Sequence, residues 1–337
     1  MLTLAIETSC DETGVALLRS KGLFSHELLL DLFSSQIATH NPYGGVVPRL
    51  AAREHEANLP LLAKKAFEKV RREKLTITHI AYTAYPGLEP ALLIGKTFAR
   101  TLSWALNIPS YPINHLDGHI VSALLTTDNK ELKNNHLFPA IGLVVSGGHT
   151  QLYELASFTK KNLLGETLDD AIGEAFDKVG RLLGLAYPGG PRLETLARQG
   201  AQTKITFPSP LLRSGDCRFS FSGLKTSVLY FLKAQKKPLG VKAKAEIAYA
   251  FQEAVLKPII EKTRQALAHS GARSLFLGGG VAANETLQEK LRVLITGQFP
   301  GVALFIPKKE FATDNAAMIA LAHNLAFLTT QQTCRKK

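Results

Sequence analysis

The chain opens with LTLAIETSCDETGVALL (residues 2–18), which predicts a strand, a tight polar turn and a second strand. A similar plan returns at AIGLVVSGGHTQLYEL (residues 140–155), where an apolar run meets a turn of small residues. Two such hairpins, one opening each half of the chain, indicate an ancient duplication. We therefore expect an α/β protein built from two lobes of the same type.

Apolar periodicity predicts the elements around these hairpins. Helices are expected over 54–72, 91–106, 169–185, 242–269 and 316–328, and strands over 77–84, 274–277 and 302–306. We place an N-terminal lobe at residues 1–118, completed by the C-terminal helix of residues 314–330, and a C-terminal lobe at residues 119–313.

The composition is that of a globular protein in a reducing compartment. The chain has 337 residues and is 45% hydrophobic, enough to bury a large core. Its first apolar run ends at Glu7, too early for a secretory core or a membrane span. The three cysteines, Cys10, Cys217 and Cys334, are far apart. We expect a cytoplasmic protein with no membrane partner.

Positive charge is concentrated in one segment of a chain whose net charge is +12. Residues 192–244 contain eleven basic side chains against Glu194 and Asp216. The basic residues are Arg192, Arg198, Lys204, Arg213, Arg218, Lys225, Lys233, Lys236, Lys237, Lys242 and Lys244. Such a segment suits a polyanion such as RNA, although a solvated lysine-rich surface would have the same composition.

Two histidines in NHLDGH (residues 114–119) have the spacing of a metal clamp. On a helix, His115 and His119 point the same way, so both imidazoles can reach one ion. A zinc protease of the HExxH type needs a glutamate after the first histidine, and here that residue is Leu116. The pattern favours holding and polarising a ligand over hydrolysis, with two polar residues on a helix face as the alternative.

A carboxylate could complete this clamp. Thr313-Asp314-Asn315 precedes the apolar helix expected over 316–328. Capping of that helix is the ordinary role for such a residue. As a ligand, Asp314 would give two nitrogens and one oxygen with open positions.

The turns of the two hairpins are candidate phosphate sites. Ser146-Gly147-Gly148 lacks bulky side chains, so backbone N–H groups could cradle a phosphate oxygen, although a plain hairpin turn explains it equally. With the turn at residues 8–13 it would form a nucleotide clamp across a cleft, as in sugar kinases and actin-like ATPases. Asp11 and Glu12 would repel phosphate there unless a cation intervenes or they act on a nucleophile.

Three more glycine-containing segments have features of ligand-binding loops. The run LGGGVAAN (residues 277–284) could lie flat against an adenine ring while Asn284 bonds the ligand; it matches the dinucleotide fingerprint only loosely. The turn at residues 187–191 follows a helix bearing Asp177, and its Gly190 would allow close approach of a ligand. Gly95-Lys96-Thr97 is not a phosphate loop, because Pro90 stands where such a loop needs glycine.

The motifs follow one another in a characteristic order: AIETSCDETGVAL, YGGVVP, HLDGH, VVSGGHTQL, GEAFDKVGRLLGLAYPGGP, FSFSGLKTSV, GGGVAAN and TDNAAMIA. In this order, and over essentially its whole length, the chain resembles the TsaD family of tRNA N6-adenosine threonylcarbamoyltransferase subunits. The resemblance implies an actin-like ATPase (ASKHA) fold, with duplicated RNase H-like lobes and a central cleft.

The resemblance also implies an activity. The family transfers a threonylcarbamoyl group from threonylcarbamoyl-AMP to N6 of adenosine 37, in tRNAs that read codons beginning with adenine, giving t6A and AMP. Implied partners are a TsaB-like paralogue and a TsaE-like ATPase. The implied cofactor is one divalent metal per subunit, Fe²⁺ in the usual assignment.

Site residues carry over by position. His115, His119 and Asp314 match the family's metal ligands. Positions that match its substrate contacts are Val144, Val145, Ser146, Gly147, Gly148, Asp177, Gly190 and Asn284, with Glu194 facing a ribose hydroxyl. Asp11 and Glu12 are candidates to orient or deprotonate the amine.

The chain departs from the family's usual pattern at a few positions. Arg49 replaces a glutamate, Tyr85 and Glu89-Pro90 replace glycines, Asp117 replaces a glutamate and Ala312 replaces a cysteine. The changes at Arg49, Tyr85 and Glu89-Pro90 bear on local surface shape and partner contacts. None of these changes removes a proposed ligand.

Three other functions fit parts of the pattern. A small-molecule kinase would use both phosphate turns and predicts ATP-dependent phosphorylation, but it does not need paired histidines. A metalloprotease would use the histidines and predicts chelator-sensitive proteolysis, but it lacks its glutamate. An RNA-binding scaffold would use the charge and predicts tRNA binding without transfer.

Overall fold

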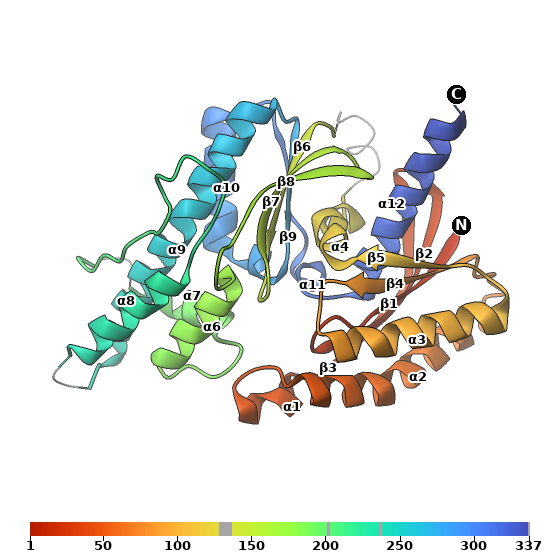
Figure 1. Ribbon diagram of the computed structural model, residues 1–337, viewed down its shortest axis with the longest axis horizontal. Helices are drawn as coiled ribbons and strands as arrows, with labels where there is room; N and C mark the ends of the chain where they lie inside the picture. The colour runs from red at the N-terminus through yellow and green to blue at the C-terminus, as the bar shows by residue number, and fades with distance from the viewer. Residues whose placement is uncertain (128–136, 201–202, 236–237, 336–337) are drawn as a thin grey trace. The chain divides into compact units, whose positions relative to one another are not determined.

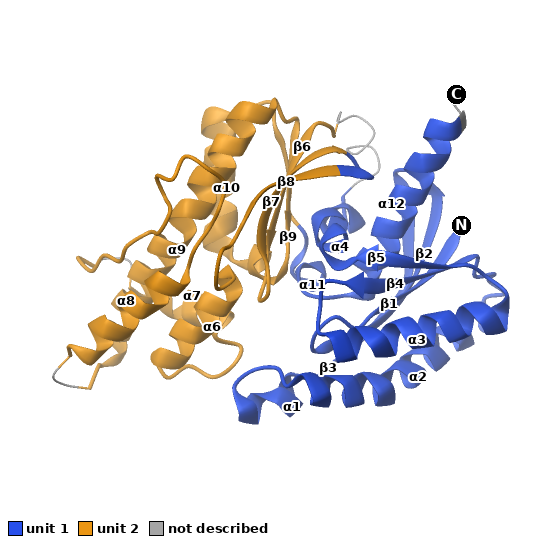
Figure 2. Cartoon of the chain, viewed as in Figure 1, with its two compact units in different colours: residues 1–136, 157–160, 307–337 blue, residues 137–156, 161–306 orange. Residues whose placement is uncertain are grey.

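The computed structural model describes residues 1–127, 137–200, 203–235 and 238–335 (Figure 1). The chain forms two compact units, shown in Figure 2. Unit 1 comprises residues 1–136, 157–160 and 307–337, and unit 2 comprises residues 137–156 and 161–306. The lobes assigned from the sequence, 1–118 and 119–313, stay a prediction. Lys236 and Lys237 of the basic segment lie outside the described residues.

Unit 1 contains a five-stranded sheet in the order β3-β2-β1-β4-β5. The strands are β1 (Leu2–Glu7), β2 (Glu12–Gly22), β3 (Ser25–Ser35), β4 (His79–Tyr85) and β5 (Ser110–Asn114). β1 and β2 form the predicted hairpin, with Glu7 opposite Gly14 at its turn end, while β1, β4 and β5 run parallel. All six residues of β1 are buried, so both faces of this strand are covered.

Helices cover both faces of this sheet. They are α1 (Ile37–His40), α2 (Pro48–Arg72), α3 (Glu89–Leu106), α4 (His115–Val121), α11 (Lys309–Ala312) and α12 (Ala316–Arg335), with short 3₁₀ turns η1 (Asn41–Tyr43) and η2 (Ser122–Leu125). α2 and α3 bury Leu59, Leu62 and Ala99 against Leu4 and Ile6. α12 lies against the other face, where Asn324 accepts a hydrogen bond from the Thr3 hydroxyl (2.6 Å).

Unit 2 repeats the strand plan in the order β10-β9-β6-β7-β8. Its strands are β6 (Ala140–Val145), β7 (Thr150–Ser157), β8 (Lys160–Glu166), β9 (Ser274–Gly278) and β10 (Ala303–Phe305). Its helices are α6 (Ile172–Leu182), α7 (Gly189–Ala197), α8 (Ser222–Lys233), α9 (Val241–Ser270) and α10 (Glu285–Gln298), with η3 (Gly280–Ala283). β6 takes the place of β1, paired antiparallel with β7 and parallel with β9. The α/β class and the duplicated plan are confirmed.

The parallel strands place the candidate site residues at equivalent sheet edges. In unit 1 the carboxyl ends of β1, β4 and β5 lead to Glu7, Tyr85 and His115. In unit 2 the ends of β6 and β9 lead to Ser146 and to the glycine run, with Val144 beside Gly278. Carboxyl ends of parallel strands are where ligands bind in open α/β sheets.

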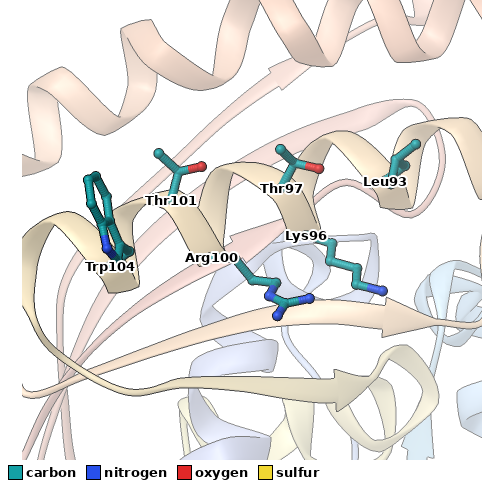
Figure 3. A pocket seen from close by; sticks show the side chains of 6 residues that line it. All are labelled: Leu93, Lys96, Thr97, Arg100, Thr101 and Trp104. Carbon is teal, nitrogen blue, oxygen red and sulfur yellow. The ribbon is translucent and has the colours of Figure 1, made fainter.

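The fold also decides the structure of one glycine-containing segment. Lys96 and Thr97 lie within α3, where they line a surface depression with Leu93, Arg100, Thr101 and Trp104 (Figure 3), so this segment is not a phosphate loop. Within the described part of the chain, none of the helices combines the length and the apolar character needed to cross a bilayer.

Candidate functional site

The two histidines of the clamp lie on α4, as the sequence predicts. The helix begins at His115 because the Asn114 side chain accepts a hydrogen bond from the backbone N–H of Leu116 (2.8 Å). The rings of His115 and His119 lie with their centroids 4.5 Å apart, and both side chains are buried. One turn of helix therefore brings both imidazoles to one place.

Close packing of α4 against α12 brings the third member to the histidines. A Cβ at Gly118 would lie 2.9 Å from Cγ of Met318 and 3.0 Å from Cδ1 of Ile319, so glycine permits the approach. Asn315, and not Asp314, caps α12, because its Oδ1 accepts from the Met318 N–H (2.8 Å). Asp314 is thereby left to face the histidines.

The geometry of this group suits a cation. Asp314 Oδ1 lies 3.4 Å from Nε2 of His115 and 3.2 Å from Nε2 of His119. One ligand atom from each residue lies within 4.8 Å of the others. Both ring nitrogens of His119 are buried; the approach of Nε2 to Asp314 does not have the geometry of a hydrogen bond, and Nδ1 has no partner among the described residues. Two imidazoles and a carboxylate are a donor set typical of transition-metal ions, and the residues therefore fit a divalent metal.

A buried carboxylate that the sequence analysis did not select lies behind His115. Glu7 is fully buried at the end of β1, and its Oε2 lies 3.1 Å from Nδ1 of His115. Its Oε1 accepts from the Ser9 N–H (2.6 Å), and the Thr83 hydroxyl donates to Oε2. The signal for Glu7 was a charged residue closing an otherwise apolar strand.

The carboxylates set the charges of the histidines. Burial alone would lower the pKa of His115, but the negative charges of Asp314 and Glu7 outweigh it and raise this pKa to about 10. Burial and the charge on His115 lower the pKa of His119. Burial opposes ionisation of Asp314, yet His115 holds the pKa of that carboxyl well below its usual range. With both carboxylates ionised and one imidazolium, the group keeps a negative charge that a cation would neutralise.

Asp11 and Glu12 lie in the same unit, Asp11 on the turn between β1 and β2 and Glu12 at the first position of β2. Burial, with a further contribution from the negative charge of Asp314, raises the pKa of Asp11. Burial is also the largest cause that raises the pKa of Glu12, to about 7. Glu12 Oε2 is buried and without a hydrogen-bond partner among the described residues. A carboxyl with a pKa near neutrality is suited to accept a proton.

In unit 2, the hairpin turn after β6 is open toward solvent. The turn is closed by Ser146, whose N–H donates to the His149 carbonyl (2.8 Å) and whose Oγ accepts from the His149 N–H (3.1 Å). A Cβ at Gly147 or Gly148 would meet nothing within 4 Å, and neither residue has a positive φ. Neither packing nor backbone conformation within the described chain therefore requires glycine, whereas close approach of a ligand would.

The other residues of unit 2 that were predicted to contact the substrate form hydrogen bonds within the unit. Asp177 Oδ1 accepts from the N–H groups of Gly189 (2.7 Å) and Gly190 (3.1 Å), so Asp177 and Gly190 are brought together. Asn284 Oδ1 accepts from the Leu287 N–H (2.8 Å) as the cap of α10, and its Nδ2 donates to Gln252 (3.2 Å).

Glu194 links α7 to the first turn of α10. Its Oε1 accepts from the Glu285 N–H (2.8 Å) and from Arg198 (3.0 Å). The structure therefore places Glu194 beside the residue that follows Asn284. A contact from Glu194 to a ribose hydroxyl stays a prediction.

A family model described as TsaD, tRNA N6-adenosine threonylcarbamoyltransferase, matches residues 27–321. The chain belongs to the TsaD family. Proteins named tRNA N6-adenosine threonylcarbamoyltransferase from Thiobacillus denitrificans and Aromatoleum aromaticum are 47% and 46% identical to it. Each alignment covers 96% of this chain and 90% of the relative.

Solved structures confirm the fold expected of a TsaD family member. HypF from T. kodakarensis aligns with a TM-score of 0.63 at 14% identity, covering 97% of this chain and 48% of that one. This chain thus spans about half the length of HypF. Component A of the Acidaminococcus fermentans (R)-2-hydroxyglutaryl-CoA dehydratase aligns with a TM-score of 0.50 at 14% identity, covering 97% and 99%. The predicted actin-like ATPase fold is confirmed, with its two α/β units.

The departures at Arg49, Tyr85 and Glu89-Pro90 lie outside the group of His115, His119 and Asp314, whereas Asp117 lies on α4 between the two histidines. Arg49 is exposed in the first turn of α2, and Tyr85 is 58% exposed at the end of β4. Glu89 and Pro90 form the first turn of α3, where proline needs no N–H partner. The retained Gly87 lets this loop approach Ser9, since a Cβ there would lie 2.7 Å from the Ser9 carbonyl oxygen.

Proposed function

We propose that this protein transfers the threonylcarbamoyl group of threonylcarbamoyl-AMP to N6 of adenosine 37 in tRNAs that read codons beginning with adenine. The observation that carries the proposal is the close match to named threonylcarbamoyltransferases over nearly the whole chain. The buried group of His115, His119 and Asp314 supports it, because paired histidines are not needed by a kinase of the same fold.

The reaction needs alignment more than covalent catalysis. Threonylcarbamoyl-AMP is a mixed anhydride, so AMP is already a good leaving group. A bond forms between N6 and the carbamoyl carbon, the bond from that carbon to the AMP oxygen breaks, and AMP leaves with the electron pair. N6 must also lose a proton. Holding a weakly nucleophilic amine at the carbonyl carbon is therefore the main task.

A carboxylate close to the turn after β1 is our candidate to take that proton. Asp11 and Glu12 both have a pKa raised by burial, and that of Glu12 lies near 7. We assign to this pair the orientation of the amine and acceptance of its proton. When bound, one Fe²⁺ held by His115, His119 and Asp314 would supply positive charge that polarises a phosphate or carbamoyl oxygen.

Unit 2 supplies the residues proposed to bind the adenylate. Backbone N–H groups of the turn that follows Val144 and Val145 (Ser146 to Gly148) would hold its phosphate, because this turn is open and lacks side chains at its glycines. Asp177 would act by fixing Gly190, and Asn284 and Glu194 by shaping the start of α10.

The basic segment is proposed to bind tRNA. Residues 192–244 carry the excess of Lys and Arg that phosphate contacts require. The target adenine can be splayed out of its stack within the anticodon loop and bound against this basic surface. We further propose that a TsaB-like paralogue and a TsaE-like ATPase assist the reaction, and that it takes place in the cytoplasm.

Mass spectrometry of tRNA nucleosides tests the activity. Purified protein is incubated with tRNA, threonylcarbamoyl-AMP, ATP and the predicted helpers, and t6A is the expected product. His115→Ala with His119→Ala should remove bound metal and reduce transfer to background, because only Asp314 of the group remains. Full transfer by this metal-free variant would contradict the assigned role. Normal tRNA binding without any transfer by the wild type would favour an RNA-binding scaffold.

A further inference from the structure

The two histidines of the proposed metal group are held differently. His115 has polar partners on the side of its ring away from Asp314, because Nδ1 lies 3.1 Å from Glu7 Oε2 and 3.2 Å from Ser9 Oγ. His119 has no hydrogen-bond partner at either nitrogen among the described residues. Any control of ring orientation by hydrogen bonding therefore acts on His115.

The surroundings of Glu7 determine which nitrogen of His115 carries hydrogen. Glu7 is fully buried, and its Oε1 is occupied by the fixed backbone N–H of Ser9. Its Oε2 accepts a hydrogen bond from the Thr83 hydroxyl and faces His115. An ionised carboxylate only accepts hydrogen bonds, so the nitrogen facing it must donate. That nitrogen is Nδ1, which leaves Nε2 of a neutral His115 with a free lone pair toward Asp314 and His119.

We propose that Glu7 is a positioning residue that holds His115 with its hydrogen on Nδ1 and thereby sets the affinity of the His115–His119–Asp314 group for a divalent metal. The arrangement of carboxylate, histidine and metal is a general way of fixing a ligand's tautomer and raising its basicity. The inference rests on the proposed metal site. It adds Glu7, at the end of β1, to the residues on which that site depends.

Glu7→Gln tests this with almost no change in shape. If the amide oxygen stays on the Ser9 N–H, the amide NH₂ faces His115 and favours hydrogen on Nε2, which blocks the metal-binding nitrogen. If the amide turns over, its NH₂ opposes the Ser9 N–H, a donor that cannot rotate away. The first arrangement is therefore favoured, and metal affinity falls.

Zn²⁺ competition against a chromophoric chelator provides the readout. We expect wild-type protein to bind Zn²⁺ and Glu7→Gln to bind it about 10- to 100-fold more weakly. The matched control is Thr3→Val, which removes another buried hydrogen bond, Thr3 to Asn324, from the opposite end of β1. It should keep wild-type affinity. Equal affinity of Glu7→Gln and wild type would overturn the inference alone, whereas wild-type protein that binds neither Zn²⁺ nor Fe²⁺ would overturn the metal site itself.

A measurement on the wild type covers the case in which Glu7→Gln does not fold. Long-range ¹H–¹⁵N spectra of the Zn²⁺-loaded protein, labelled at histidine, report the tautomer of each ring. The signals that disappear in the His115→Gln variant are those of His115. In the wild type we expect these signals to show hydrogen on Nδ1 and none on Nε2. Hydrogen on Nε2 of His115 would overturn the proposal.

Discussion

Titration of the Glu12 side chain should be visible in both stability and activity. Burial raises the pKa of its carboxyl from 4.5 to about 7 in the folded protein. Ionisation is thus more costly in the folded than in the unfolded chain, so stability should fall as pH rises from about 4.5 to about 7 and stay level above.

Glu12→Gln should remove this loss. With allowance for partial exposure, we expect the variant to be about 1–2 kcal/mol more stable than wild type at pH 8 and similar to it near pH 5. Urea unfolding across this range measures the difference. If Glu12 is the proton acceptor, the rise of transfer rate through pH 7 should also disappear; parallel stability curves for both proteins would contradict the shift.

Single residues also mark where sequence reasoning reached and where it stopped. The i, i+4 spacing of His115 and His119 was sufficient to place both imidazoles together. Asp314 was a candidate ligand from its carboxylate, with helix capping as the alternative. Only the family resemblance assigned it to the histidines, because no local pattern links it to a helix so far away in sequence. Glu7 was seen only as the end of an apolar run, since its partners Thr83 and His115 come from other strands and helices.

At the scale of elements, the start of α12 holds Asp314 in place. Asn315 caps this helix, and its Nδ2 donates to the Thr313 carbonyl (2.8 Å) on the other side of Asp314. Asn315→Ala should cost about 1 kcal/mol of stability and also lower Zn²⁺ affinity. Asn284→Ala removes the equivalent cap of α10 in unit 2, and should cost similar stability with no loss of Zn²⁺ affinity. Equal Zn²⁺ affinities for the two variants would show that the cap does not position Asp314.

The start of α6 supports the glycine turn of unit 2 in the same way. A Cβ at Gly173 would lie 2.6 Å from the Ser146 carbonyl oxygen and 2.8 Å from Cα of Gly147, and these backbone atoms cannot move aside cheaply. Gly173→Ala should cost about 1–3 kcal/mol and weaken AMP binding. Gly223→Ala, at a helix start with nothing within 4 Å, is the control and should be neutral or slightly stabilising. Calorimetry with AMP distinguishes them; unchanged binding by Gly173→Ala would argue against this turn as the phosphate site.

Elements with strong periodicity were predicted, and weakly patterned ones were missed. The long helices α2, α3 and α9 and the hairpin strands β1, β2, β6 and β7 follow from their apolar spacing. β3 was not anticipated because it is half-buried along most of its length, without the alternation of a one-sided strand. β5 has only five residues and contains proline, and β8 is largely polar and exposed. These strands depend on pairing with neighbours that sequence alone does not reveal.

For the whole molecule, charge makes a prediction about RNA binding. With a net charge of +12, tRNA affinity should fall steeply with salt, by about 10³-fold between 50 and 200 mM if about six phosphates are contacted. Replacing Lys204, Arg213, Lys225 and Lys233 with glutamine should flatten the dependence of log affinity on log salt. The control replaces Lys64 and Lys65, which are exposed on α2, and should leave the slope unchanged. Equal slopes would place the RNA surface outside residues 192–244.

The two units share a strand order, and this duplication was predictable from the sequence. The different functional residues that each unit carries were not predictable from the duplication. Both hairpins were visible as repeated apolar runs, and the same connectivity follows them. The copies have diverged at their equivalent edges: in unit 1, β1 leads to carboxylates and β5 to the histidines, whereas in unit 2 β6 leads to an open glycine turn. Chemistry of that kind resides in a few side chains on a shared scaffold.

Unit 1 is finished only by residues 307–337, after all of unit 2. During translation both imidazoles therefore leave the ribosome long before Asp314. The hydrogen bond from Thr3 of β1 to Asn324 likewise forms only after unit 2 has been synthesised. A chain interrupted before this point offers an ion two imidazole nitrogens without the carboxylate of Asp314. Loading with a divalent metal would therefore wait until Asp314 has been synthesised, and shorter translation products would compete poorly for metal in the cell.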